Sequence, residues 1–275
     1  MRRQGELMGK VGRRDPVKVR SVFLSDVHLG TRECRADRLL DFLHSVDMER
    51  LYLVGDIIDL WSLRKGIYWP QQHSNVLRTL LGKAKQGTRI IVVPGNHDEP
   101  LREFCGQAFG NIEFHRDCVH VSARGLRLLV LHGDEFDGIV RGGRLVALLG
   151  SHLYDLVLRW SYRLNVLRGL LGLRHWSLAT WIKGRVGNAV RHVERFEHAA
   201  AAAARRAGLD GVICGHIHRP EVAALQGVLY CNDGDWVEHC TALVEDRSGE
   251  LELWDWSQAD AGVAYLVADT QPQAA

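Results

Sequence analysis

The sequence of 275 residues lacks the features that hold small secreted domains together or place a chain in a membrane. Its six cysteines lie far apart and include no C-x-x-C pair, which argues against a zinc knuckle or redox motif and is typical of reduced, mostly buried thiols. No segment approaches the ~20 apolar residues of a membrane span, and the polar, basic N-terminus has no apolar signal-peptide core. We therefore expect a cytoplasmic protein.

An excess of charge of one sign is missing as well. The 35 Lys and Arg residues nearly balance the 33 Asp and Glu residues, and a net charge of +2 argues against a whole-surface nucleic-acid binder. The length and a hydrophobic fraction of 46% suit one large folded domain rather than a disordered chain or a coiled coil. The residue present in surplus is histidine, with 14 copies.

Strand, loop and helix alternate along the first hundred residues. Apolar, β-branched runs predict strands at 19–25, 51–54 and 89–93, and amphipathic stretches predict helices at 35–46 and 75–85. This βαβαβ order is typical of a parallel sheet, in which ligand sites lie beyond the carboxyl ends of the strands. We therefore expect the functional loops directly after these runs.

The alternation changes after residue 110. Closely spaced runs at 112–114, 118–122 and 127–131 predict antiparallel strands, with a hairpin turn at Arg124-Gly125. Residues 137–206 contain no convincing strand and are predicted to form helices, the last of which includes the alanine run 199–204. Later strands are expected at 211–214, 222–225, 228–231, 240–244 and 251–254.

The predicted fold class is therefore α/β, with two β-rich halves and a helical insertion between them. Residues 1–17 carry no periodic pattern and are expected to form a disordered leader. One domain is expected at 18–260, with the insertion at about 137–207, and residues 261–275 are expected to form a C-terminal tail.

Five polar loops follow five of the predicted strands and contain residue types that bind divalent cations. Carboxylate, imidazole and amide oxygen suit Mn, Fe or Zn, and the lack of cysteine in these loops argues against a structural zinc site. In an extended loop, residues i and i+2 point to the same side, so both members of a D-x-H or H-x-H pair can face one pocket. The loops are Asp26-Val27-His28, Gly55-Asp56-Ile57-Ile58-Asp59, Gly95-Asn96-His97-Asp98, His132-Gly133-Asp134 and Gly215-His216-Ile217-His218.

In this order the loops resemble the five signature blocks of the calcineurin-like metallophosphoesterase superfamily, D-x-H, G-D-x-x-D, G-N-H-D, H-G-D and G-H-x-H. The resemblance covers residues 25–219. It implies a four-layer α-β-β-α sandwich with a helical lid insertion, and two divalent metal ions. The implied ligands of one ion are Asp26, His28, Asp56 and His218, and those of the other are Asp56, Asn96, His132 and His216.

Elementary electrostatics agrees with a carboxylate shared between two ions. Two divalent cations ~3.5–4 Å apart repel each other and need an anion between them, for which Asp56 is suited. Such a pair activates water near neutral pH and neutralises charge that develops on a phosphoryl group. The nine histidines outside the five loops follow no ligand spacing and are expected to be surface or packing residues.

His97 has no metal to bind in the family pattern. We expect it to protonate the leaving oxygen or stabilise the phosphoryl group, with Asp98 as its orienting partner. Asp59 and Asp134 are expected to fix the orientation of ligands. The alternative for Asp59, Asp98 and Asp134 is a purely structural role in a turn or at a helix N-cap.

The predicted insertion has an unusual composition. Residues 138–192 contain nine Lys or Arg and a single acid, Asp155, interleaved with Leu, Val and Trp. This mixture suits an interfacial lid that offers apolar surface to acyl chains and cations to phosphate. The alternative is that the apolar residues form the helices' own core and the arginines a solvated face. Charge and location suggest Arg141 and Lys183 as phosphate contacts.

At a finer level the sequence resembles the UDP-2,3-diacylglucosamine hydrolase branch of this superfamily. The matching segments are LSDVHLGTR at 24–32, YLVGDIID at 52–59 and GHIHRP at 215–220, with an insertion of this length before the last one. The resemblance implies hydrolysis of the pyrophosphate of a UDP-linked diacyl sugar to UMP and a lipid 1-phosphate in bacterial lipid A synthesis. It also implies manganese as the usual metal and a peripheral position on the cytoplasmic face of the inner membrane.

One position departs from this branch. Its best-known members carry arginine where this sequence has His97, whereas histidine follows the general superfamily pattern. One alternative is therefore a phosphodiesterase or phosphatase for another phosphoester, and another is a membrane-associated binding protein with a vestigial site. The expected partners are a nucleotide-linked lipid and the inner membrane surface, without nucleic acid, and the oligomeric state stays open.

Overall fold

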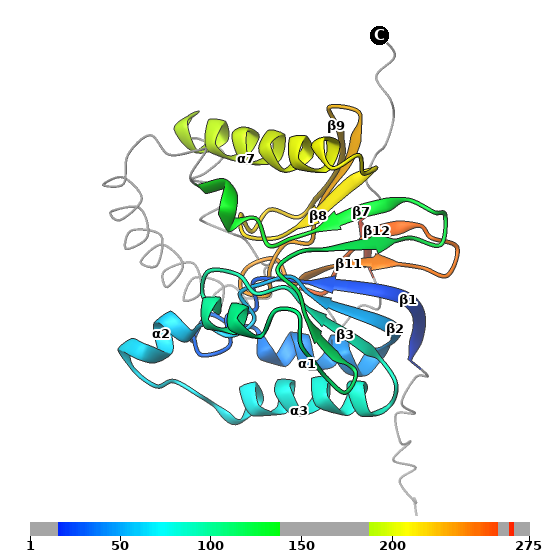
Figure 1. Ribbon diagram of the computed structural model, residues 1–275. Coiled ribbons are helices and arrows are strands. Elements are labelled where there is room, and N and C mark those ends of the chain that lie inside the picture. Colours follow the sequence, from blue (N-terminus) through cyan, green and yellow to red (C-terminus); the bar gives the residue numbers. More distant parts are fainter. Residues whose placement is uncertain (1–15, 138–186, 258–263, 267–275) are drawn as a thin grey trace, which may run out of the picture.

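The computed structural model describes residues 16–137, 187–257 and 264–266, which form two β-sheets with flanking helices (Figure 1). The larger sheet has eight strands in the order β13 (Ala264–Leu266), β12 (Leu251–Asp255), β11 (Thr241–Glu245), β1 (Val17–Leu24), β2 (Val46–Leu53), β3 (Arg89–Val92), β5 (Ile112–Phe114) and β4 (Ala108–Phe109). The smaller sheet has five, in the order β6 (Cys118–Val121), β7 (Arg127–Val130), β8 (Gly211–Cys214), β10 (Val228–Asn232) and β9 (Glu221–Leu225). The α-helices are α1 (Ala36–Ser45), α2 (Leu60–Lys65), α3 (Gln71–Lys85) and α7 (Gly187–Arg206), and η1 (Glu99–Phe104) and η2 (Asp134–Phe136) are 3-10 helices.

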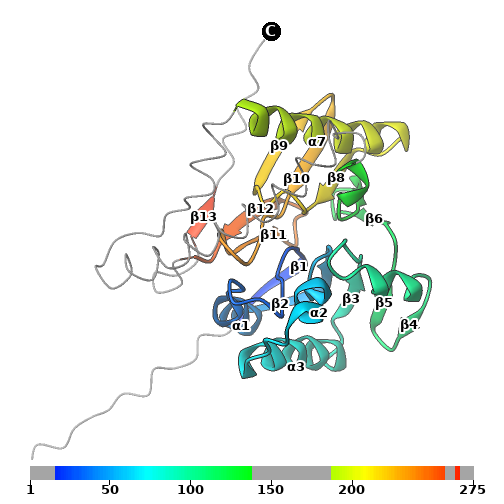
Figure 2. The ribbon, with the colours of Figure 1, turned by 90° about the vertical axis from the view of Figure 1, so that its left-hand side faces the viewer.

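Three apolar cores separate these elements into four layers. The first core lies between α1, α3 and the larger sheet, and includes Phe42 and Val76. The second core fills the space between the two sheets, where Phe23 of one sheet and Ile213 of the other are completely buried. The third core packs α7 against the smaller sheet around Phe196. Figures 1 and 2 show these helices on the outer faces, so the predicted α-β-β-α sandwich is confirmed.

The sequence of β1 explains its position inside the larger sheet. Val22 and Leu24 pack into the core on the helix side, whereas Phe23 between them points into the core between the sheets. A strand that is buried on both faces has the continuous apolar sequence observed here. β1 pairs parallel with β2, and β2 pairs parallel with β3, which confirms the predicted βαβαβ arrangement.

The strand pairing differs from the sequence prediction in two places. β6 and β7 form the predicted antiparallel hairpin, but β5 pairs parallel with β3 in the larger sheet. The side chains of Ile112 and Phe114 pack against the helix-side core, which places β5 in that sheet. β11 and β12 belong to the predicted second half of the chain, yet β11 pairs antiparallel with β1 and thus extends the larger sheet. The two sheets therefore do not correspond to the two halves of the sequence.

Several predictions fall outside the described residues. The leader lies outside them except at its last two positions, and so do residues 138–186 of the insertion, including Arg141 and Lys183. The last part of the insertion is α7, which contains the predicted helical alanine run. β13 lies in the range expected to be a tail and pairs antiparallel with β12. In the described parts of the chain, no helix is long and apolar enough to cross a membrane.

A buried polar group connects the two sheets. Glu245 of β11 is completely buried, forms an ion pair with Arg20 of β1, and accepts the backbone N–H of Ala123 at 2.8 Å. Its other oxygen lies 3.0 Å from Nε2 of His120 on β6, and Nδ1 of His120 is hydrogen-bonded to the Tyr52 hydroxyl at 2.9 Å. Burial raises the pKa of Glu245, but His120 and the other donors outweigh it and lower the pKa to about 2.

We expect Glu245→Gln to reduce the free energy of unfolding by about 3 kcal/mol at neutral pH, because it removes the buried carboxylate that is the counter-charge of the half-buried Arg20. The wild-type protein gains stability from the ionised carboxylate above the ordinary glutamate pKa and loses it as the pH falls toward 2. This acid-dependent loss should therefore shrink in the variant. Urea denaturation at several pH values measures both effects.

Glu250→Gln is the matched control, because Glu250 forms its ion pair with Arg124 at the surface. An exposed pair contributes at most about 1 kcal/mol. Equal losses of stability in the two variants would contradict a stabilising role for the buried group.

Candidate metal centre

All seven predicted metal ligands lie at the carboxyl ends of parallel strands, as expected. Those of the first three loops follow β1, β2 and β3 of the larger sheet, and those of the last two follow β7 and β8 of the smaller sheet. Both sheets therefore contribute side chains to one site. The seven residues are Asp26, His28, Asp56, Asn96, His132, His216 and His218.

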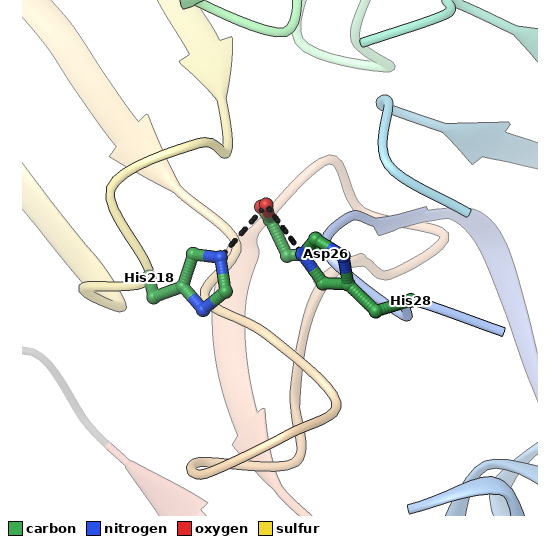
Figure 3. Close-up of side chains that lie close together, drawn as sticks. All are labelled: Asp26, His28 and His218. Carbon is green, nitrogen blue, oxygen red and sulfur yellow. Dashed lines mark ion pairs between the residues drawn. The ribbon is translucent and has the colours of Figure 1, made fainter. Parts of the chain in front are cut away.

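The first cluster combines residues of the first and the last of the five loops. Asp26, His28 and His218 place one ligand atom each within 4.8 Å of one another (Figure 3). Oδ1 of Asp26 lies 3.1 Å from Nε2 of His218 and 3.8 Å from Nε2 of His28. Oδ2 of Asp26 accepts hydrogen bonds from the hydroxyl of Ser25 at 2.6 Å and the backbone N–H of His216 at 2.8 Å. Asp26 thus directs one oxygen to the imidazoles and uses the other as an anchor.

A second cluster consists of Asp56, His132 and His216. Nδ1–H of His132 donates to the carbonyl of Val54 at 2.8 Å, which leaves Nε2 on the side of Asp56, whose Oδ2 is 3.4 Å away. A backbone carbonyl on the far nitrogen is the usual way in which proteins fix the tautomer of a metal-binding histidine. Oδ2 of Asp56 also lies 4.0 Å from Nε2 of His28, so Asp56 stands between the two clusters.

His97 belongs to a third cluster, together with His28 and Asp59. Oδ2 of Asp59 lies 3.0 Å from Nδ1 of His97 and 3.2 Å from Nδ1 of His28. Nε2 of His97 lies 4.0 Å from Oδ2 of Asp56, and the ring of Trp61 packs against the imidazole with its centroid 4.4 Å away. The other oxygen of Asp59 caps α2 by accepting the N–H of Ser62.

Asp98 does not contact His97 as the sequence predicted. Its two oxygens accept backbone N–H groups of Gly95, Asp56 and Ile57 at 2.6, 3.3 and 2.8 Å. This buried carboxylate therefore ties the loop after β3 to the loop after β2, which is the structural alternative for Asp98. Asp59, whose position relative to His97 depends on the fold, takes the place that was expected for Asp98.

The remaining acidic residues near the site have different partners. Asp134 forms a two-oxygen ion pair with Arg102 at 2.7 and 2.8 Å, so it fixes η2 to η1 rather than contacting a predicted ligand. The sequence prediction missed Asp137, whose Oδ1 lies 2.9 Å from Nε2 of His216. It also missed Asp235, whose Oδ2 lies 4.0 Å from Nδ1 of His218. Neither residue follows a motif spacing, so the sequence offered no signal for them.

The backbone around the ligands is unusual. Seven described non-glycine residues have positive φ, and five of them are the predicted ligands Asp26, His28, Asp56, His216 and His218. Left-handed conformations of such residues each cost roughly 1–3 kcal/mol and cluster at functional sites. The members of D-x-H and H-x-H therefore reach one pocket through left-handed turns and not through the extended loop that the spacing suggested.

One glycine shows how closely the backbone approaches the ligands. A Cβ on Gly95 would lie 2.3 Å from Oδ1 of Asp56 and 2.7 Å from the ring of His132. A residue larger than glycine would therefore displace two predicted ligands.

The charges of the buried groups stabilise one another. Burial raises the pKa of Asp26 and of Asp56, but His218 and His132 respectively outweigh it and hold both values well below the usual range. Burial lowers the pKa of His132, yet the facing Asp56 raises it to about 10. The carboxylates likewise hold the pKa of His28 well above its ordinary value. Acidic groups in this site thus favour bound positive charge.

The donor atoms fit divalent cations. Oδ1 of Asp26, Oδ1 of Asn96 and Nε2 of His132 are buried and lack a hydrogen-bond partner among the described residues. Buried polar atoms rarely stay unpaired, and carboxylate, amide oxygen and imidazole nitrogen are the ligands that first-row divalent cations take. The residues present therefore suit a metal pair.

Because protons and metal ions compete for the same atoms, we expect Mn²⁺ binding to release protons at pH 7. The raised pKa values of His28 and His132 mean that a metal-free site holds protons that a cation must displace. Affinity should accordingly increase between about pH 6 and pH 8. Calorimetric titrations in buffers with different ionisation enthalpies measure the release, and a binding enthalpy independent of the buffer would contradict this expectation.

Comparisons with known proteins agree with this arrangement. A model of the calcineurin-like phosphoesterase family matches residues 19–220. A UDP-2,3-diacylglucosamine hydrolase of Pseudomonas paraeruginosa is 28% identical and covers 84% of this chain and 97% of its own length. Other hydrolases of the same name are 25–26% identical over 83% of this chain.

Two further matches are more distant or shorter. A DNA polymerase II small subunit of Methanothermobacter thermautotrophicus is 29% identical over 42% of this chain, and the match spans 30% of that protein. The solved structure of a phosphoesterase from E. coli gives a TM-score of 0.45 at 14% identity, and covers 90% of this chain and 96% of that chain. Since the family model spans most of the sequence and every predicted ligand, the chain belongs to the calcineurin-like phosphoesterase family of metal-dependent hydrolases.

Proposed function

We propose that this hydrolase cleaves the pyrophosphate of UDP-2,3-diacylglucosamine, or of a closely similar nucleotide-linked lipid, to UMP and a lipid 1-phosphate. The observation that carries the proposal is the pair of carboxylate and imidazole clusters around Asp56, at the ends of strands from both sheets. The choice of substrate is supported by relatives of this name that match over 89–97% of their own length.

In this proposal Asp26, His28, Asp56 and His218 would hold one ion, and Asp56, Asn96, His132 and His216 would hold the other. Manganese is the proposed metal, because carboxylate, imidazole and amide ligands suit it, with Fe or Zn as alternatives. When bound, the metal pair supplies activation of water and neutralisation of charge on the phosphoryl group. The protein's own contribution is to hold the side chains of these ligands in fixed orientations.

His97 is proposed to hold the proton that the leaving oxygen needs. Its Nδ1 faces Asp59 at 3.0 Å, which orients the ring and leaves Nε2 directed toward Asp56 and the clusters. The tilted ring of Trp61 limits rotation of the imidazole from the other side. Asp59 is thus a positioning residue for His97, and through its 3.2 Å contact also for His28.

The insertion and the membrane belong to the same proposal. Arg141 and Lys183 are proposed to contact phosphate, and the basic, apolar segment that contains them is proposed to bring the enzyme to the cytoplasmic face of the inner membrane. The mixture of leucine, tryptophan and arginine in that segment supports this idea, since a nucleotide-linked lipid presents both acyl chains and phosphates.

We expect the purified, manganese-loaded protein to release UMP from UDP-2,3-diacylglucosamine in detergent micelles faster than it hydrolyses a chromogenic phosphodiester. Chromatographic quantification of UMP measures the reaction, and Asp56→Ala serves as the inactive control. UMP release at the rate of that control, together with rapid cleavage of the diester, would favour the second candidate, a phosphodiesterase for another substrate, which the histidine at position 97 favours.

His97→Ala should lower kcat by roughly 10²- to 10⁴-fold, the usual contribution of a positioned general acid, without weakening Mn²⁺ binding. Asp59→Ala should lower kcat and also weaken Mn²⁺ binding, because Asp59 contacts both His97 and His28. Steady-state kinetics and calorimetry separate the two effects. His44→Ala, which removes an exposed histidine of α1, is the control and should leave both quantities unchanged.

A further inference from the structure

The loop that follows β10 contacts two of the loops that carry predicted ligands, although no signature block includes it. Asn232, the last residue of β10, is in register with Cys214 at the end of β8. The N–H of Asp233 donates to the carbonyl of Cys214 at 3.1 Å. The strand pairing and this hydrogen bond place Asp233 beside the start of the loop that carries His216. The side chain of Asp233 is completely buried.

The carboxyl group of Asp233 contacts the loop after β1 through one hydroxyl. Oγ of Ser25 lies 2.5 Å from Oδ1 of Asp233 and 2.6 Å from Oδ2 of Asp26, and the carbonyl oxygen of Gly234 is more distant at 3.1 Å. A hydroxyl has a single proton, so it can donate to only one of these two carboxyl groups. If Ser25 donates to Asp26, the short contact with Asp233 requires a proton on Asp233.

Two observations favour that order of donors. Asp26 faces His218 and His28, which stabilise its ionised form, whereas Asp233 has no ion pair among the described residues and its Oδ2 lacks a hydrogen bond. Independently, burial and the nearby charge of Asp26 raise the pKa of Asp233 well above its usual range. A neutral Asp233 therefore donates to Ser25, and Ser25 donates to Asp26.

From this geometry we infer that Asp233 is a positioning residue, which acts through Ser25 to hold the carboxylate of Asp26 in the orientation that a metal ion requires. Oδ2 of Asp26 then receives Ser25 Oγ–H and the N–H of His216, while Oδ1 faces the imidazoles. The inference rests on the proposed role of Asp26 as a metal ligand.

Close packing makes the chain of hydrogen bonds difficult to replace. A Cβ on Gly215 would lie 2.2 Å from Oγ of Ser25 and 2.6 Å from Oδ2 of Asp26. A Cβ on Gly234 would lie 1.9 Å from Oγ1 of Thr241, whose hydroxyl donates to the carbonyl of Asp233. The two glycines let both loops approach Ser25, so the hydroxyl has a fixed position between the two carboxyl groups.

The test compares the Mn²⁺ affinity of the full chain with that of variants by calorimetry. Asp233→Ala and Ser25→Ala should each weaken binding by about 10- to 100-fold, the usual effect of losing a partner of a metal ligand. Asp233→Asn retains a side-chain donor and should bind Mn²⁺ like the unmodified protein. Because the two residues act in one chain, the double Ala variant should bind no more weakly than either single variant.

Cys231→Ala is the matched control, because Cys231 is also completely buried in β10, but its side chain packs in the apolar core between the sheets. It should lower the melting temperature without changing the Mn²⁺ affinity. If Asp233→Ala fails to fold, Ser25→Ala and Asp233→Asn still decide the question. Unchanged affinity in Ser25→Ala, or equal losses in Asp233→Asn and Ser25→Ala, would overturn the inference.

Measurements of kcat and of Mn²⁺ affinity test this inference separately from the proposed substrate. At saturating Mn²⁺ the Ser25→Ala variant should recover most of its kcat, because its defect lies in metal affinity. The ranking of affinities needs no substrate, so it supports or overturns the role of Asp233 whether or not the lipid pyrophosphate is hydrolysed.

Discussion

The structure depends on the burial of acidic side chains where the two sheets end together. Asp26 and Asp56 are almost completely removed from water, and a carboxylate in such a place needs positive charge or hydrogen-bond donors close by. Imidazoles and backbone N–H groups provide part of this requirement, and divalent cations are suited to provide the rest. The left-handed turns of the ligand loops serve the same requirement, because five of these ligands reach the site from residues with positive φ.

The contact between the sheets is part of the site for the same reason. The two buried carboxylates come from the larger sheet, whereas His132, His216 and His218 come from the smaller one. Relative movement of the sheets would separate the two carboxylates from these three imidazoles. The apolar core between them and the buried pair of Glu245 with His120 oppose such movement. A histidine expected only to pack thus contributes to the alignment of the site.

Four buried or half-buried aspartates near the candidate metal centre make different contacts, although each follows a strand. Asp59 orients two imidazoles, Asp98 ties two loops through backbone N–H groups, and Asp134 pairs with an arginine. Asp233 shares a serine hydroxyl with a predicted ligand. What distinguishes them is the surroundings: imidazoles favour an ionised carboxylate, whereas an apolar site next to another carboxylate favours a neutral one.

Local patterns in the sequence predict most of the strands, the order of the five loops and the residue types in them, because alternation of apolar residues and the position of polar residues at strand ends are local properties. The packing of the whole fold sets the other features: β5 and β11 join the larger sheet, Asp59 and not Asp98 faces His97, and Asp233 reaches Ser25. These contacts join residues that are far apart in the sequence, such as Ser25 and Asp233, which are 208 positions apart. No local pattern specifies them, because they arise from the packing of one sheet against the other.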